Sequence, residues 1–401
     1  MFRRPTSAVL TDSLLGTFLG FIAGLVPGIH SNTFASLTLI YSSKFSNPAA
    51  IIISSSIAYT IANILPTVLL GVPDEETAIA VHPANQMVLE GRGFEAVTIS
   101  AVSSFLAVVI SFLLYPAVWF LGVNYSAVTS FIPVALIAIS AFLILTERGE
   151  EFGGRYSAWR KRFYALLVFT VSGFTGIVAF QVSEYVTDPL GSILLPLLTG
   201  LFGVPILLQT TGGRIPQQRV RFRLPDSNAV SAGTVAGFLV SLFPGVSSGV
   251  ATVLSTVGIR GREEYVAAVS AANSANAVLC FFMLISASRT RSGAAEALKQ
   301  LGAFPSLFEI VAISTLSALV ALPLTLAVAK VAFSHITRLQ FSKISLAVLV
   351  FLIALTYILT GFMGVMILFV SSVIGMSAPL LGVRRVNCMG CLIIPVLLYY
   401  L

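Results

Sequence analysis

The chain has 401 residues, of which 57% are hydrophobic and 10% are charged, and its mean hydropathy is +0.96. A soluble domain carries about 25% charged residues, so this composition excludes a soluble globular protein and indicates lipid as the solvent. The net charge of +7 arises from 23 Lys and Arg against 16 Asp and Glu. Because long apolar spans separate the basic residues, they indicate cytoplasmic loops and no nucleic-acid partner.

Most apolar stretches are long enough for a helix to cross the bilayer, which takes about 20 residues. Two segments of about thirty residues, 12–45 and 228–258, differ because each has a Pro-Gly break near its middle. We expect these two to form re-entrant helical hairpins or broken helices. The predicted spans, in chain order, are 50–71, 96–121, 127–146, 163–182, 189–209, 264–286, 303–333, 344–359, 362–381 and 387–401.

The two Pro-Gly segments are copies of one sequence. GTFLGFIAGLVPGIHS at 16–31 and GTVAGFLVSLFPGVSS at 233–248 match at eight of sixteen positions, with a constant offset of 217. Two halves with corresponding Gly/Pro-interrupted segments are typical of secondary transporters. We therefore predict a first transmembrane repeat at 1–210, a basic inter-repeat linker at 211–227 and a second transmembrane repeat at 228–401.

The predicted fold is an all-α polytopic membrane protein with two inverted-topology repeats. Each repeat has one hairpin and about five transmembrane helices, and an odd number of spans turns the second repeat upside down in the membrane. Six of the 23 basic residues then lie on the side of the N-terminus, and the remaining seventeen lie on the other side. The positive-inside rule predicts a multi-pass protein of the cytoplasmic membrane whose N-terminus is outside the cell.

The turns of the two hairpins are the predicted anion site. A half-helix that begins after each turn presents free N–H groups and the positive end of its dipole to an anion. Pro and Gly kinks also serve packing, but two aligned copies favour a site. The predicted site residues are Pro27, Gly28, His30, Ser31, Asn32 and Thr33 in the first copy and Pro244, Gly245, Ser247 and Ser248 in the second.

Three asparagines in apolar spans are predicted to form the neighbouring shell of this site: Asn63, Asn273 and Asn276. An amide inside an apolar span costs free energy unless it is hydrogen-bonded or holds a ligand. Ala62–Asn63 can be aligned with Ala275–Asn276. Substrate or cation binding by these amides and interhelical hydrogen bonding remain alternatives at this stage.

Ion coupling has three candidate residues. Asp74 and Glu75 follow a predicted helix break, and His30 is a titratable group inside the first hairpin. Carboxylates could bind Na⁺ or a proton, and a histidine could carry a proton; solvated loop residues are the alternative. Arg289 and Arg291 either attract an anion or lie at the membrane surface, and we favour the surface.

Signals for an enzyme are weak. Residues 245–249 formally match G-x-S-x-G, but that motif needs a strand–turn–helix context and downstream acid and histidine partners. Cys388 and Cys391 form a lone C-x-x-C without a second pair, so we expect neither a metal site nor a redox site. We therefore predict that the protein is not an enzyme and that it uses no cofactor other than a coupling Na⁺ or H⁺.

The chain resembles the TctA family, the large membrane subunit of tripartite tricarboxylate transporters, in particular its shorter archaeal branch. The resemblance implies an inverted-repeat permease for di- or tricarboxylate-like anions driven by a cation gradient. It implies a small membrane subunit and an extracytoplasmic binding protein as partners, and it is compatible with a homodimer. The motifs that carry it are LVPGIHSNT at 25–33, LGVPDEETA at 70–78, HPANQMVLEGRGFEA at 82–96, LFPGVSSGV at 242–250 and SAANSANAV at 270–278.

A weaker resemblance supports an alternative function. PGVSSG at 244–249 is similar to the P-G-x-S-G-G repeats of polyprenyl-phosphate translocases, which move a carrier lipid across the membrane. The same helix N-termini would then hold a lipid phosphate in place of a small organic anion. Membrane lipids would be partners under either function, and a lipid substrate would require a cavity that opens laterally to the bilayer.

Overall fold

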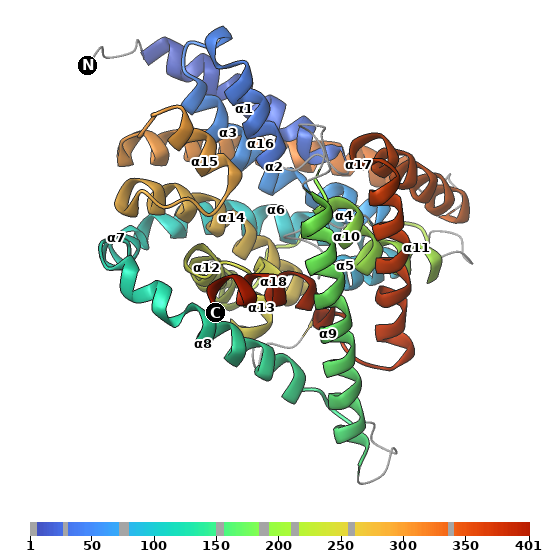
Figure 1. Ribbon diagram of the computed structural model, residues 1–401. Helices are drawn as coiled ribbons and strands as arrows, with labels where there is room; N and C mark the ends of the chain where they lie inside the picture. Colours follow the sequence, from blue (N-terminus) through green and yellow to red (C-terminus); the bar gives the residue numbers. More distant parts are fainter. Residues whose placement is uncertain are drawn as a thin grey trace.

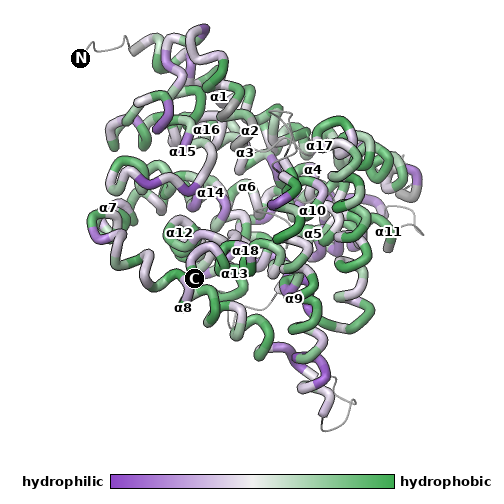
Figure 2. The backbone as a smooth tube through the Cα atoms, in the orientation of Figure 1, coloured by the Kyte–Doolittle hydropathy of each residue, from purple (hydrophilic) through white to green (hydrophobic). Residues whose placement is uncertain are grey.

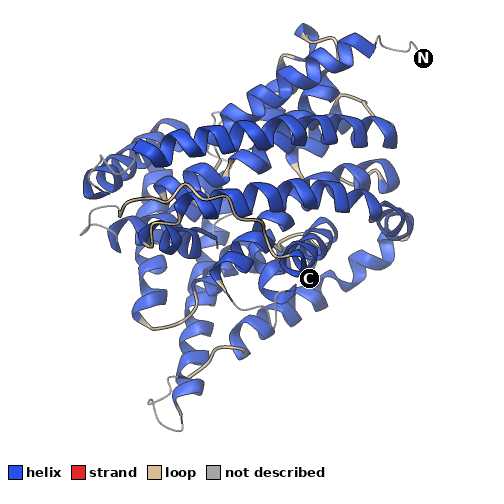
Figure 3. Ribbon diagram, turned by 180° about the vertical axis from the view of Figure 1, so that it is seen from behind, coloured by secondary structure: helices blue, strands red, loops and turns tan. Residues whose placement is uncertain are grey.

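The computed structural model describes residues 6–26, 31–71, 80–149, 156–183, 192–209, 216–255, 261–335 and 341–401. Within these ranges the secondary structure is helical throughout, without a strand (Figure 3). The two ends of the described chain lie far apart in Figure 1, the N-terminus at the tip of α1 and the C-terminus within the group of α12, α13 and α18. The fold class is therefore an all-α polytopic membrane protein.

The helices of the first half follow each other with short connections. They are α1 (Thr6–Leu25), α2 (Ser31–Ile40), α3 (Pro48–Ala62), α4 (Ile64–Leu70), α5 (Val81–Leu89), α6 (Gly93–Leu113), α7 (Tyr115–Val123), α8 (Tyr125–Leu145), α9 (Ser157–Val182), α10 (Leu194–Leu198) and α11 (Val204–Gln209). Asn47 begins α3 as its N-cap, because its side chain accepts a hydrogen bond from the backbone N–H of Ala50. A π-helical turn at Thr199–Gly203 joins α10 to α11.

The helices of the second half are α12 (Ser227–Leu242), α13 (Ser248–Ser255), α14 (Arg262–Ala287), α15 (Gly293–Gln300), α16 (Leu307–His335), α17 (Phe341–Leu380) and α18 (Gly390–Tyr400). Asp226 caps α12 through a 2.9 Å hydrogen bond from the backbone N–H of Ala229. Before α12, residues 216–226 run without helix across the molecule, as the long loop in Figure 3 shows.

Eight helices of the described ranges are long and apolar enough to cross a membrane. Seven of them fall in predicted spans, although the span 96–121 is divided between α6 and α7, and the eighth, Ser7–Leu25, lies mostly in the predicted hairpin segment 12–45. The predicted spans 189–209 and 387–401 correspond to shorter helices, Leu194–Leu208 and Arg385–Tyr400. The eight are Ser7–Leu25, Pro48–Leu70, Gly93–Leu113, Tyr125–Leu145, Ser157–Val182, Arg262–Ala287, Leu307–His335 and Ser345–Leu380.

The last of these helices contains a break that the sequence predicted. Spans were expected at 344–359 and 362–381, and in the structure Gly361 interrupts α17 with φ 67° and ψ −164°. Only glycine adopts this conformation readily, because a Cβ would clash with the backbone. α17 is therefore two helices joined at Gly361, and Figure 1 shows its two arms pointing in different directions.

Each predicted hairpin consists of a long helix, a break and a shorter helix. The break between α1 and α2 falls at the first Pro-Gly sequence, and the break between α12 and α13 falls at the second. The structure describes only the outer parts of the first break. The second break, at Phe243–Ser247, is described in full.

Glycine contacts recur between the halves at the offset of the sequence repeat. A Cβ at Gly16 would lie 2.7 Å from the Cα atom of Ile51, and a Cβ at Gly233 would lie 2.8 Å from the Cα atom of Ala268. Ile51 and Ala268 are themselves 217 positions apart. Bare glycines at these positions let α1 pack closely on α3, and α12 on α14, at the same register.

A second glycine pair extends this correspondence. Gly20 packs against the backbone of Ser55, and a Cβ at Gly237 would lie 2.5 Å from the carbonyl oxygen of Ala272. Ser55 and Ala272 again differ by 217. The alignment of Asn63 with Asn276 uses an offset of 213, so the two amides lie one helical turn apart in this register.

The helices α3 and α14 run in opposite directions through the core. One buried cluster joins α4, which follows α3 directly, to the first residues of α14, including Val266 and Ala267. A larger cluster joins Ala49–Ala62 of α3 to the later residues of α14, from Ala271 to Leu284. The start of α14 therefore packs beside α4, at the far end of the α3–α4 segment, and its later residues pack against α3.

Hydroxyl groups connect the two halves inside this core. The hydroxyl of Ser274 donates to that of Thr60 over 2.9 Å, and the hydroxyls of Ser100 and Ser270 lie 2.7 Å apart. Small hydroxylated residues allow close helix packing and satisfy one another where water is absent. These hydrogen bonds account for the buried hydroxyl groups of α3, α6 and α14 through helix packing, without a bound ligand.

An ionic network links the halves where α6 and α14 begin. Arg92 bonds to Glu95 at 2.8 Å and to Glu263, and Arg223 bonds to Glu263 at 2.8 Å. Glu95 is buried, so its charge requires such a partner. Arg92 comes from the first half and Glu263 from the second, and Arg223 precedes α12. The network therefore holds both halves in register at one end of the core.

Two helices, α8 and α17, are the least buried of the eight candidate spans. Only 17% of the most apolar window of α8 is buried inside the protein, compared with 22% for α17 and 94% for α14. Hydrophobic residues cover the lengths of α8 and α17 in Figure 2, and hydrophilic residues gather near the corner where α8 leads to α9. In a membrane protein such surfaces face lipid, so α3 and α14 form the core and α8 and α17 its periphery.

Candidate functional site

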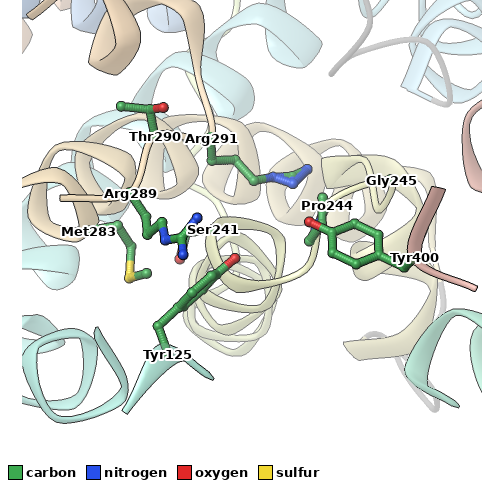
Figure 4. Close-up of a pocket in the computed structure, with 9 residues that line it drawn as sticks. All are labelled: Tyr125, Ser241, Pro244, Gly245, Met283, Arg289, Thr290, Arg291 and Tyr400. Atoms are coloured by element: carbon green, nitrogen blue, oxygen red, sulfur yellow. The ribbon is translucent and has the colours of Figure 1, made fainter. Parts of the chain in front are cut away.

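A cavity of about 270 Å³ lies at the second Pro-Gly turn (Figure 4). Four elements meet there: the end of α12, the last turn of α14 with the loop after it, the start of α8 and the end of α18. The residues that line it are Tyr125, Ser241, Pro244, Gly245, Met283, Arg289, Thr290, Arg291 and Tyr400.

Arg291 holds the turn from the loop that follows α14. Its two terminal nitrogens donate to the backbone carbonyl oxygens of Phe243, at 2.9 Å, and Val246, at 2.8 Å. The hydroxyl of Tyr125 lies 3.5 Å from the carbonyl oxygen of Leu242. The last carbonyls of a helix lack intrahelical partners and carry its negative dipole end, so a cation is stabilising there. Arg291 therefore connects both sides of the break.

Gly245 gives the turn its shape. Its φ is +81°, a left-handed conformation that other residues adopt at a cost. A Cβ at this position would also lie 2.8 Å from the Cβ atom of Val396 in α18. The turn therefore needs glycine for its backbone conformation and for close contact with α18.

The cavity is electropositive. Its lining contains two arginines and no acidic residue. Neither Arg289 nor Arg291 has an ion pair with any residue that the structure describes. Arg289 is exposed, and its guanidinium lies 5.5 Å from the ring centre of Tyr125. An anion that enters this space meets an uncompensated positive charge.

Ser247 and Ser248, predicted to face the anion, take part in local structure. The hydroxyl of Ser247 accepts a hydrogen bond from the backbone N–H of Val250 at 3.3 Å, which makes it a cap for α13. It also lies 3.8 Å from the sulfur of Met389. Ser248 is fully buried at the start of α13. Neither residue lines the cavity, so only Pro244 and Gly245 of the predicted residues in this copy do.

The three predicted asparagines are buried in the core. Asn63 sits at the junction of α3 and α4, and the thiol of Cys280 donates to the side-chain oxygen of Asn276 at 3.4 Å. Asn273 differs because it is 4% exposed and its side-chain nitrogen has no hydrogen-bond partner among the described residues. An unpaired buried amide costs about 1–3 kcal/mol, so Asn273 has unused capacity for a ligand.

The first copy of the site is described only in part. Pro27, Gly28 and His30 lie outside the described residues, as do Asp74 and Glu75. Ser31, Asn32 and Thr33 open α2, and their side chains also lie outside what is described. Whether the two turns approach each other therefore stays a prediction.

Several cavity residues could not be found from local sequence. Tyr125 and Tyr400 come from segments 275 positions apart, and no motif marks them. Arg289 and Arg291 form a basic pair after an apolar span, a pattern that favours a position at the membrane surface. Instead, Arg291 is partly buried and reaches the turn, because unpaired carbonyls at the end of α12 attract it.

Comparison with known proteins identifies the family. The model of the tripartite tricarboxylate transporter TctA family matches residues 10–390, nearly the whole chain. The chain belongs to the TctA family. An uncharacterized protein of Methanocaldococcus jannaschii is 28% identical over 408 residues, which cover 97% of this chain and 98% of that protein. No solved structure matches the chain.

Family membership establishes the general role of the chain. TctA proteins are membrane components of tripartite tricarboxylate transporters and not enzymes, so this chain is a multi-pass transporter component. The resemblance predicted from the Pro-Gly, LGVPDEETA and SAANSANAV motifs is confirmed. Nothing in the comparisons supports the polyprenyl-phosphate alternative.

His82 of α5 provides a pH test outside the membrane spans. His82 is exposed to solvent, and partial desolvation by its neighbours, together with the charges of Arg385 and Arg262, lowers its pKa below the usual 6.5. A histidine whose pKa is lower in the folded than in the unfolded protein stabilises the fold at pH values above its unfolded-state pKa. That contribution is lost as the pH falls through the folded-state pKa. We expect the thermal midpoint to drop between pH 7.5 and 5.5, and His82→Gln to reduce this drop. An equal drop in the variant contradicts the assignment.

Proposed function

We propose that this TctA protein is a secondary-transport permease for a small organic anion with two or three carboxylates, coupled to Na⁺ or H⁺. The observation that carries the proposal is the cavity at the Pro244–Gly245 turn, with two arginines and no acidic residue in its lining. A cationic cavity at a helix break suits a carboxylate substrate. The family supports the same substrate class.

The proposed architecture is a pair of inverted repeats, 1–210 and 228–401, joined by the linker 211–227. The opposite directions of α3 and α14, together with the glycine contacts at offset 217, support this arrangement. In such a transporter the two breaks face one substrate site near the middle of the membrane. We place the second contact of the anion at the first turn, near Pro27 and Gly28.

Asn273, which is not among the residues that line the cavity, and the coupling residues are the further ligands that we propose for the substrate or the ion. The unpaired amide of Asn273 is available to the substrate or to an ion. Asp74, Glu75 and His30 remain the candidates for coupling, because carboxylates and imidazole bind Na⁺ or protons. A small membrane subunit and an extracytoplasmic binding protein are the proposed partners, as expected for a member of a tripartite transporter family.

The test is uptake of labelled citrate and succinate into proteoliposomes, with an inward Na⁺ gradient, an inward proton gradient or neither. We expect saturable uptake that one gradient accelerates. Binding of citrate to protein in nanodiscs then tests the site: Asn273→Ala should weaken binding at least tenfold, since a lost hydrogen bond to a charged group costs about 1.5–3 kcal/mol.

The matched control is Asn228→Ala, which removes an exposed amide at the start of α12. It should leave both binding and uptake unchanged. No binding of either carboxylate by the unaltered protein, alone or with the predicted partner subunits, contradicts the proposed function. Equal affinity of the Asn273 and Asn228 variants contradicts the assignment of Asn273.

A further inference from the structure

We infer that the two arginines at the second turn have different tasks: Arg289 binds a carboxylate of the substrate, and Arg291 is a positioning residue that holds the Pro244–Gly245 turn. The inference rests on the proposed function, because it assigns the carboxylate contact of that same site. It goes beyond the predicted site, which placed the anion at helix N-termini and the arginines at the surface.

The hydrogen bonds of Arg291 define its task. Both terminal nitrogens are occupied by the carbonyl oxygens of Phe243 and Val246, on either side of the break. These bonds use two of the five N–H donors of the guanidinium, and its buried Nε has no hydrogen-bond partner among the described residues. Arg291 therefore contributes charge to the cavity, and its directed hydrogen bonds serve the backbone.

Arg289 has the opposite properties. It is exposed, it makes no hydrogen bond or ion pair with the described residues, and its guanidinium lies over the face of Tyr125. Stacking on an aromatic ring orients a planar guanidinium and leaves its N–H groups free in the ring plane. Arg289 is thus held in place with its donors available.

The surroundings of Arg289 suit a carboxylate. In Figure 4 the guanidinium of Arg289 and the hydroxyls of Tyr125 and Tyr400 turn toward the same space beside the end of α12. Two phenol groups next to a guanidinium can donate to a second oxygen-bearing group of the ligand. The cavity volume of about 270 Å³ leaves room for a small polycarboxylate.

The test compares three variants by citrate binding and by thermal unfolding of the protein in nanodiscs. Arg289→Gln should weaken citrate binding at least tenfold with an unchanged unfolding midpoint. Arg291→Gln should lower the midpoint, because two carbonyls of the turn lose their donors. Arg221→Gln, an exposed arginine of the linker, should change neither quantity. Arg289→Lys should recover part of the affinity, since it restores the charge without the planar fork.

The outcomes separate the two proposals. If the unaltered protein binds no carboxylate, the proposed function fails and takes this inference with it. If citrate binds and Arg289→Gln keeps the original affinity, only the assignment of Arg289 is wrong. If inorganic phosphate binds through Arg289 and citrate and succinate do not, the substrate is a phosphate and the carboxylate assignment is overturned. Loss of binding in Arg291→Gln with an unchanged midpoint overturns the division of tasks.

Discussion

Replacing Gly245 with alanine should lower the thermal unfolding midpoint of the protein and abolish transport. The left-handed conformation at φ +81° costs a residue with a Cβ about 1–2 kcal/mol. The new Cβ would also lie 2.8 Å from the Cβ of Val396, and such overpacking typically costs about 1–3 kcal/mol more. The turn would have to move, and the bonds from Arg291 to its carbonyls would be lost with it.

Gly302 offers the matched control for this substitution. Its φ is +61°, but nothing lies within 4 Å of the position that its Cβ would take. Gly302→Ala therefore introduces a similar backbone cost without the steric conflict. The unfolding midpoint should drop much further in Gly245→Ala than in Gly302→Ala, and only the former should lose citrate uptake. Equal midpoints in the two variants would show that contact with Val396 is unimportant.

The fold was predictable where composition and Gly/Pro positions carry the signal. Apolar spans are required by the bilayer, so their length and order can be read from hydropathy alone. The break in α17 at Gly361 could also be predicted, because the sequence separates two adjacent spans there without any knowledge of φ. The second Pro-Gly turn was likewise placed correctly, since a missing N–H and a missing Cβ leave few alternatives to a helix break.

The composition of the site was less predictable, because it depends on contacts between distant segments. Serines after the turn were expected to face an anion, whereas Ser247 caps its own helix. Local hydrogen bonds compete for such hydroxyls, and a sequence motif does not reveal which partner is used. The Tyr125, Tyr400 and Arg291 side chains reach the turn only after α8, α18 and the loop after α14 have packed around α12.

The alignment of the asparagines illustrates a further limit of prediction from the sequence. Matching Ala-Asn pairs align Asn63 with Asn276 at an offset of 213, whereas the contacts of Gly16 and Gly20 correspond to those of Gly233 and Gly237 at an offset of 217. In that register Asn276 corresponds to Tyr59 and Asn63 to Cys280. Both registers occur in the glycine contacts, because a Cβ at Gly24 would meet Ala62 and Asn63, and a Cβ at Gly237 would meet Ala275 and Asn276, at an offset of 213.

Removing the carboxylate of Glu147 should destabilise the protein strongly. Glu147 follows α8 and is 5% exposed, and one of its oxygens accepts three hydrogen bonds. The donors are the backbone N–H of Arg384 at 3.0 Å, its Nε at 3.0 Å and the side-chain nitrogen of Asn387 at 2.7 Å. Glu147→Ala leaves these donors without their acceptor. Breaking a buried pair costs about 3–5 kcal/mol, and the partial exposure of Arg384 places the expected loss at the low end of that range.

Two comparisons make the Glu147 prediction specific. Glu147→Gln keeps an oxygen in place and loses only the charge, so it should lower the unfolding midpoint less than Glu147→Ala. Glu90→Gln affects a carboxylate that is 42% exposed and pairs with Arg262, and exposed pairs contribute about 0–1 kcal/mol. Denaturation of the three variants in one detergent should therefore rank Glu147→Ala lowest and Glu90→Gln near the unaltered protein. If Glu147→Ala and Glu90→Gln denature at the same temperature, the contact between the end of α8 and the segment before α18 does not depend on this carboxylate.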